Sequence, residues 1–458
     1  MVTNASSITP HYGSPLLPPP ADQILTPLPP LLSHQMLPDY ILTIIGPIIA
    51  YWALSITFEI FDYFDWFAQH RIHTPVEVKM RNRVGKKEVA WWVFIQQVLQ
   101  MGFAYFLSYL EGEEMSGFEQ KEQYEMYLRV VGVEGLLVKG LTLFGINGVG
   151  LEQKIGRGIL SLGGLVKVLE GVRFGGIVEG TSGDWRMDLA SVLYWYIVPA
   201  MRLWIALFIL DTWQYFLHRL MHTIPALYRA IHSHHHRLYC PYAFGALYNH
   251  PLEGFLMDTI GAGLAFKLSG MGQQGGLFFF TFSTLKTVDD HCGYKLPWDP
   301  LQWAFWNNAE YHDIHHQSWG IKTNFSQPFF ICWDRWLNTQ WIGSPKLTEE
   351  RYRKSREIVN RMASKEKQVI ESEDSSCSSS EDVSIATATT STANGTVVMN
   401  GGVDKVLING GKELKGILPE EDSGWDDNSS DGSGEISLVG GTKQEQRELR
   451  SRRAAAAR

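Results

Sequence analysis

Histidine is the residue type whose number and spacing in this sequence point most directly to chemistry. Of the 15 histidines, 11 lie between His218 and His316. They occur in five strings: HRLMH (218–222), HSHHH (232–236), NHP (249–251), DDH (289–291) and HDIHH (312–316). A neutral imidazole is a common ligand of iron, zinc and copper. The pattern therefore indicates a metal site built mainly from histidine.

The spacing within three of these strings is helical. Positions i and i+4, or i, i+3 and i+4, share one face of a helix, so HRLMH and both HxxHH strings are expected to present their histidines together. We expect His234, which lies between these positions, to point away. A structural zinc ion takes four protein ligands, and a catalytic one usually takes three and a water. Eight to ten imidazoles therefore predict two metal ions with open coordination positions.

Three apolar runs of membrane length precede these histidines and must position them. The runs are Tyr40–Phe58, Val89–Leu110 and Leu189–Leu210. The first two contain 19 and 22 residues without a charge, and the third is interrupted only by Arg202. A helix needs about 20 residues to cross a hydrocarbon layer of about 30 Å. Any one run would also suit a buried helix of a soluble protein, but the three together predict an integral membrane protein.

A further apolar stretch, residues 255–285, is broken by the glycine-rich segment 269–276. Its halves are short for full spans, so we expect a helical hairpin or re-entrant pair that returns the chain to the side it left. Residues 71–87, between the first two runs, carry six Lys and Arg, and basic residues in a short loop favour the cytosolic side. This orientation predicts a lumenal insert at 111–188 and a cytosolic histidine cluster.

Composition divides the rest of the chain. Residues 1–38 contain nine prolines, and we expect a disordered arm without a cleaved signal peptide. Residues 346–458 are charged and rich in Ser and Gly, and we predict a largely disordered tail. The expected membrane-embedded unit is therefore 39–345.

Charge and cysteine content exclude several classes of protein. Residues 371–435 hold 14 Asp and Glu against 3 Lys and Arg, a net charge of −11. Because the whole chain has a formal net charge of −8, the remaining residues together are close to neutral. A nucleic-acid-binding surface needs a basic surplus that is absent here. The four cysteines form no CxxC pair, which argues against a disulfide framework and a cysteine zinc site.

Longer strings surround the histidines. They are DTWQYFLHRLMH (211–222), YAFGALYNHP (242–251), TVDDHCGY (287–294) and YHDIHHQSWGIKTNFS (311–326), with HTP (73–75) and RNRV (81–84) upstream. Over about residues 40–340 the chain resembles the membrane fatty acid hydroxylase superfamily, and more narrowly its sphinganine C4-hydroxylase branch. The three-part histidine pattern is specific for the superfamily, whereas the longer strings point to the branch.

The resemblance implies an all-α fold: an integral membrane helical bundle of about four spans or hairpin halves, capped by a cytosolic histidine-rich di-metal domain whose catalytic part is 211–340. It implies an enzyme of the endoplasmic reticulum membrane with two iron ions, although a purified sample could carry zinc instead. The implied reaction is O₂-dependent hydroxylation of sphinganine, or its ceramide form, at C4. The implied ligands are His218, His222, His232, His235, His236, His312, His315 and His316, with His250 and His291 as further candidates.

Carboxylates close to these histidines are expected to orient the metal-bound rings, because ligating imidazoles usually donate their other N–H to such a group. The candidates are Asp211, Asp289, Asp290, Glu310 and Asp313. The one GxGxxG string, at residues 270–275, lies in the glycine-rich break of the apolar hairpin rather than between a strand and a helix, so it is no nucleotide-binding fingerprint. The electrons must therefore come from another protein. The resemblance implies cytochrome b5 and its NAD(P)H-dependent reductase, and the basic segment 71–87 is a candidate docking site.

Two alternatives stay open. Other oxygenases of the superfamily, namely sterol C4-methyl or C5 oxidases and fatty acid 2-hydroxylases, share the histidine set. A histidine-rich zinc transporter is an alternative of a different class, and it predicts ligands inside the membrane spans and no need for O₂. A zinc hydrolase is disfavoured because the chain contains neither HExxH nor GxSxG.

Overall fold

The computed structural model describes residues 26–27, 38–111, 114–116, 118–147, 150, 154 and 185–378. Within these residues the regular secondary structure is helical, apart from two short strands, β1 (Thr26–Pro27) and β2 (Met115–Ser116), which pair antiparallel. The predicted all-α fold is confirmed.

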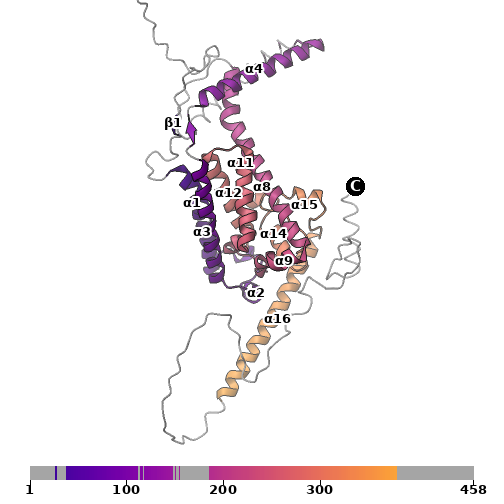
Figure 1. Cartoon of the computed structure of the whole chain (residues 1–458). Coiled ribbons are helices and arrows are strands. Elements are labelled where there is room, and N and C mark those ends of the chain that lie inside the picture. The colour runs from indigo at the N-terminus through magenta and orange to yellow at the C-terminus, as the bar shows by residue number, and fades with distance from the viewer. Residues whose placement is uncertain are drawn as a thin grey trace, which may run out of the picture.

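A bundle of long helices forms the body of the molecule (Figure 1). Its members are α1 (Asp39–Tyr63), α3 (Lys86–Glu111), α8 (Val198–Thr223), α11 (Gly261–Ser269) and α12 (Gln273–Asp290). Towards one end lie α2 (Pro75–Arg81), α9 (Pro225–Ala230), α14 (Ala309–His316) and α16 (Pro345–Ser378), and at the other end lies α4 (Glu119–Leu143). The shorter helices are α7 (Trp185–Val192), α10 (Pro251–Gly254), α13 (Pro300–Ala304) and α15 (Cys332–Trp336).

Three helical segments are long and apolar enough to cross a membrane. They are Asp39–Tyr63, Lys86–Leu110 and Trp185–Thr223, and each contains one of the three predicted apolar runs. Large apolar side chains such as Leu99, Leu110 and Trp204 are more than half exposed on them. Exposed apolar surface of this extent fits contact with lipid. The predicted membrane character is confirmed.

The expected helical hairpin is also present. Residues Pro251–Ser269 form α10, a π-helical segment and α11 in succession, and the chain then turns at Gly270, whose φ of 68° suits glycine. The second arm, α12, packs closely against α1, where Gly46 permits the approach. A Cβ at Gly46 would lie 2.7 Å from Leu277 Cδ1. The hairpin thereby becomes part of the bundle.

Helix α8 links the membrane segment to the histidines. Its 26 residues extend about 39 Å at 1.5 Å per residue. Its first half is largely apolar, whereas its second half buries Asp211, Gln214, His218 and His222 at spacings of three or four residues. These four side chains therefore share one buried face, and the helix carries two histidines directly from the apolar segment into a polar interior.

The segment predicted as a C-terminal tail begins with a packed helix. The tail was expected to begin at residue 346, but α16 begins at Pro345, and its Tyr352, Ser355 and Val359 are buried. The Tyr352 hydroxyl donates a 2.6 Å hydrogen bond to Asp313, in α14. Only about one residue per turn faces the domain, so a charged and otherwise solvated sequence conceals a packed helix.

The other disorder predictions fall almost entirely outside the described residues. Among residues 1–38, the structure describes only 26–27 and 38, and it describes none of 379–458. Of the insert at 111–188, it describes mainly α4 and the start of α7.

The contact between Tyr352 and Asp313 predicts a stability effect. Replacing Tyr352 by Phe should lower the free energy of unfolding by roughly 1–3 kcal/mol, because a buried carboxylate loses a hydrogen-bond donor. The measurement is the thermal unfolding midpoint in detergent, with Tyr63→Phe as the matched control, since the Tyr63 side chain is 81% exposed. Equal midpoints for the two variants would show that α16 is not anchored through this contact.

Candidate metal centre

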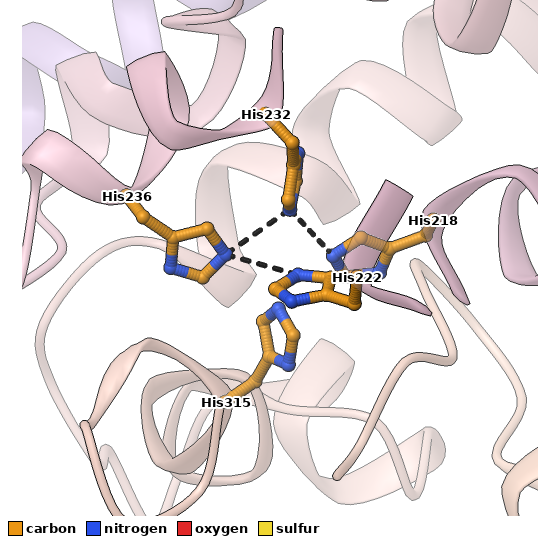
Figure 2. Close-up of side chains that lie close together, drawn as sticks. All are labelled: His218, His222, His232, His236 and His315. Atoms are coloured by element: carbon orange, nitrogen blue, oxygen red, sulfur yellow. Dashed lines mark hydrogen bonds between the residues drawn. The ribbon is translucent and has the colours of Figure 1, made fainter. Parts of the chain in front are cut away.

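Nine of the ten predicted ligands come together in two buried groups. The first group contains His218, His222, His232, His236 and His315, and the second contains His235, His291, His312 and His316. Within each group the candidate ligand atoms all lie within 4.8 Å of one another. Figure 2 shows the rings of the first group converging from three separate segments of the chain.

The two HxxHH strings each contribute to both groups. His232 and His236 belong to the first group and His235 to the second, whereas His312 and His316 belong to the second and His315 to the first. The three histidines of each string therefore reach the same centre but divide between its two groups. Residues 232–237 form a 3₁₀ helix rather than an α-helix. His235 joins the group that holds His312 and His316, and His315 joins the group that holds His232 and His236. This exchange places the groups side by side.

Local structure positions the remaining rings. His218 and His222 lie in the last turns of α8, and His291 follows the last residue of α12. The helix that carries the third string, α14, is capped by Asn308, whose side chain accepts a hydrogen bond from the Tyr311 amide. The site is thus built on the ends of helices.

Most of the rings are held by their Nδ1 atoms. Five donate an Nδ1–H hydrogen bond to a backbone carbonyl oxygen: His218 to Phe325 (2.8 Å), His235 to Tyr248 (3.1 Å), His291 to Thr287 (2.8 Å), His315 to Thr323 (2.7 Å) and His316 to Leu238 (2.8 Å). A carbonyl oxygen cannot donate, so the proton must be on Nδ1. The Nε2 lone pair of each neutral ring is therefore free for a metal.

The sixth anchored ring is held by a carboxylate. His232 Nδ1 lies 2.6 Å from Glu253 Oε1. Glu253 was not among the predicted carboxylates, although it follows the NHP string by two residues and is the first acidic residue of the apolar hairpin. This short distance along the sequence from a histidine string was the signal that could have identified Glu253 as a carboxylate that orients a ligand ring.

The Nε2 atoms lie too close together to be left without a cation. His218 Nε2 and His232 Nε2 are 3.1 Å apart, yet both rings are held through Nδ1, so their Nε2 lone pairs face each other. In the second group, His312 Nε2 lies 3.0 Å from His291 Nε2 and 3.1 Å from His316 Nε2. The buried Nε2 of His315 has no hydrogen-bond partner among the described residues. This donor set fits two metal ions, one for each group.

Burial keeps these rings neutral. Desolvation lowers the pKa of His232 to about 3 and that of His235 to about 4. Burial, followed by the neighbouring imidazoles, also lowers the pKa of His316 well below its ordinary value. Neutral imidazole is the form that binds a metal, so the rings are ready to act as ligands near neutral pH.

His250 and His234 lie outside both groups. His250 caps α10, and its Nδ1 accepts a 3.2 Å hydrogen bond from the Leu252 amide. The structure therefore does not bring this predicted ligand to the centre. His234 packs against the Tyr248 ring, with ring centroids 4.4 Å apart, as expected for a histidine that points away.

Three of the predicted orienting carboxylates bind partners other than the clustered imidazoles. Asp211 accepts hydrogen bonds from two backbone amides, those of Phe329 (3.2 Å) and Phe330 (2.5 Å). Asp289 accepts one from Gln302 (3.0 Å). Glu310 forms a surface ion pair with Lys295 (2.6 Å). The contacts expected between these carboxylates and ligand rings are not formed.

The other two candidates also bind elsewhere. Asp290 forms a buried ion pair with Lys286. Asp313 accepts a 2.8 Å hydrogen bond from His73 Nε2 in addition to the bond from Tyr352. This bond to His73 ties the segment before α2 to α14.

Comparisons with known proteins agree with this geometry. Residues 203–339, which include all nine clustered histidines, match the family model for fatty acid hydroxylase. The chain is 36% identical to a sphingolipid C4-hydroxylase of Saccharomyces cerevisiae, over 70% of this chain and 76% of that protein. It is 39% identical to a sphingolipid C4-hydroxylase of Schizosaccharomyces pombe (69% and 93%) and 37% identical to sphinganine C4-monooxygenase 1 of Arabidopsis thaliana (66% and 87%).

None of the solved structures matches the chain. The relatives nevertheless align over more than three quarters of their own lengths, and the family match covers the region that holds both histidine groups. On these grounds the chain belongs to the fatty acid hydroxylase family.

Proposed function

We propose that this protein is a membrane-bound, O₂-dependent monooxygenase that hydroxylates C4 of sphinganine, or of its ceramide form, to give a 4-hydroxy sphingoid base. The observation that carries the proposal is the pair of buried histidine groups that share their two HxxHH strings. The names of the relatives that align along most of their lengths supply the substrate and the position of hydroxylation.

The proposed cofactor is two iron ions. His218, His222, His232, His236 and His315 would hold one, and His235, His291, His312 and His316 the other. Bound iron supplies the reductive activation of O₂ that oxidation of an unactivated C–H bond requires, since no acidic or basic side chain can attack such a bond. Histidine also binds zinc well, so the reaction rather than the ligand type favours iron.

The protein's own groups prepare this site in three ways. The backbone carbonyls hold the rings in the tautomer with a free Nε2. Glu253 accepts the Nδ1–H of His232 and supports its basicity. Burial of the rings excludes bulk water, which would otherwise bind the metal and allow side reactions.

We further propose that the site faces the cytosol at the membrane of the endoplasmic reticulum. The basic segment 71–87 contacts the histidine-bearing part of the chain, because the Arg83 amide donates a 2.8 Å hydrogen bond to the Arg237 carbonyl oxygen. Arg81 lies over the Tyr239 ring, 4.6 Å from its centroid. If basic loops remain cytosolic, the histidine groups share that side.

Electrons for the reaction would come from cytochrome b5 and its NAD(P)H-dependent reductase. The support is the charge of segment 71–87, which holds six Lys and Arg and suits an acidic partner surface. Arg81 and Arg83 of this segment contact the histidine-bearing part of the chain.

The first prediction concerns a ligand histidine. His315→Ala should reduce formation of the 4-hydroxy product from sphinganine by about 100-fold or more. The loss of a residue that merely supports a metal ligand typically lowers activity about 10–100-fold, and this variant loses a ligand itself. The measurement is mass spectrometry of products formed with O₂ and a reducing system. His234→Ala is the matched control and should retain activity. Turnover of wild type without O₂ would contradict the proposal, as would sterol or fatty acid products in place of the 4-hydroxy base.

The second prediction concerns the carboxylate that the sequence did not reveal. Glu253→Gln should lower the metal affinity of the protein by about 10–100-fold, because an amide supports the His232 imidazole less well than a carboxylate does. Metal retained during titration with a chelator, measured by elemental analysis, reports this affinity directly. Glu310→Gln, which removes a charge from a surface pair, is the control. Equal retention by both variants would show that Glu253 does not support the metal site.

A further inference from the structure

A polar cavity lies beside the two histidine groups. Four clustered histidines line it: His232, His235, His291 and His312. Its other polar lining residues include Gln214, Asn249, Glu253, Asp258 and Asp290. Ala246, Met257 and Pro328 add apolar atoms to the lining, but most of the lining side chains can form hydrogen bonds, which fits the polar part of a lipid better than its tail.

Asp258 is held in the cavity by three amide groups. Its carboxylate accepts hydrogen bonds from Gln96 Nε2 (3.3 Å), Gln214 Nε2 (3.4 Å) and Asn249 Nδ2 (3.3 Å). Two of these residues are adjacent to the metal centre, because Gln214 lies one helical turn before His218, and Asn249 follows Tyr248, which binds His235. Asp258 is therefore fixed relative to both histidine groups.

The three acids of the cavity differ in their positive partners. Asp290 forms an ion pair with the buried Lys286, whereas Glu253 accepts a hydrogen bond from the Nδ1–H of the neutral His232 ring. Among the described residues that line the cavity, none is a Lys or Arg, and the three side chains that donate hydrogen bonds to Asp258 are neutral amides. Apart from the metal ions proposed for the histidine groups, no cationic side chain among the described lining residues neutralises Asp258. A carboxylate removed from water is costly without a cation, so the position favours a cationic ligand.

A second observation also points to a ligand. Two buried carboxylate oxygens that belong to lining residues, Glu253 Oε2 and Asp290 Oδ2, have no hydrogen-bond partner among the described residues. Buried acceptors are normally satisfied. A molecule that supplies both a positive charge and hydroxyl donors would satisfy the cavity.

The head of a free sphingoid base has this chemistry. It carries an amine on C2 and hydroxyl groups on C1 and C3, and the amine is protonated near neutral pH, as aliphatic amines generally are. Three bonds of about 1.5 Å separate the amine nitrogen from C4, so the two lie within about 4 Å of each other. If C4 is the carbon oxidised at the histidine groups, the amine must occupy a site directly beside them.

We propose that Asp258 is the positioning residue that binds the C2 ammonium of a free sphingoid base, while Glu253 and Asp290 accept hydrogen bonds from its hydroxyl groups. This inference rests on the proposed function and narrows it. N-acylation removes the positive charge that Asp258 recognises, so the protein acts on the free base in preference to the ceramide form.

The experiment compares sphinganine with N-acetylsphinganine in wild type, Asp258→Asn and Asp258→Glu. Binding to the detergent-solubilised full-length protein is measured as ligand-dependent thermal stabilisation, and turnover as kcat/KM from product analysis. Wild type should favour sphinganine over N-acetylsphinganine at least about 10-fold in affinity and in kcat/KM, since hydrogen bonds between charged groups are stronger than those between neutral groups. Asp258→Asn should weaken sphinganine about 10–100-fold and N-acetylsphinganine about 3-fold or less, with metal content unchanged, and Asp258→Glu should recover part of the loss.

Glu357→Gln, which removes one carboxylate from the exposed face of α16, is the charge-matched control and should behave as wild type. Equal losses for the two lipids in Asp258→Asn, or no preference in wild type, would overturn the assignment of Asp258. If wild type forms no 4-hydroxy product from sphinganine or from N-acetylsphinganine, the proposed function is overturned instead. The two failures are distinct, because binding tests the assignment of Asp258 and product formation tests the function.

Discussion

Neutral imidazoles whose Nε2 lone pairs face each other in a buried space repel one another unless a cation lies between them. His218 and His232 face each other in this way at 3.1 Å, with both Nδ1 atoms already bonded elsewhere. The rest of the architecture serves this constraint. Backbone carbonyls and Glu253 fix the rings, burial lowers their pKa values, and the exchange of histidines between the two HxxHH strings makes the two groups neighbours.

The membrane segments and the metal centre are parts of one packed unit. Helix α8 is apolar where it would contact lipid, and it places His218 and His222 at its other end. The hairpin that returns the chain contributes Glu253 and Asp258 from its first arm and His291 from the end of its second.

Much of this organisation could be predicted from the sequence, because the signals are local. Apolar runs of about 20 residues predicted the spans, and helical spacing identified eight of the nine histidines that do meet, while the resemblance supplied the ninth, His291. The failures concern tertiary packing. Helical spacing could not show that His235 and His315 turn to opposite groups, or that His250 caps a helix instead. The predicted carboxylates bind other partners, while Glu253 is brought to His232 across 21 positions of the chain. Helix α16 packs through one residue per turn, which its charged composition hides.

The most direct test of the central claim is a count of tightly bound metal ions per chain, by elemental analysis of purified protein, in wild type, His222→Ala and His316→Ala. These variants remove one ring from the first and the second group respectively. If each group holds its own ion, wild type should contain about two ions and each variant about one, provided that loss of one ligand releases an ion. A single ion in wild type that disappears in both variants, or a count that neither substitution changes, would contradict two separate histidine sites.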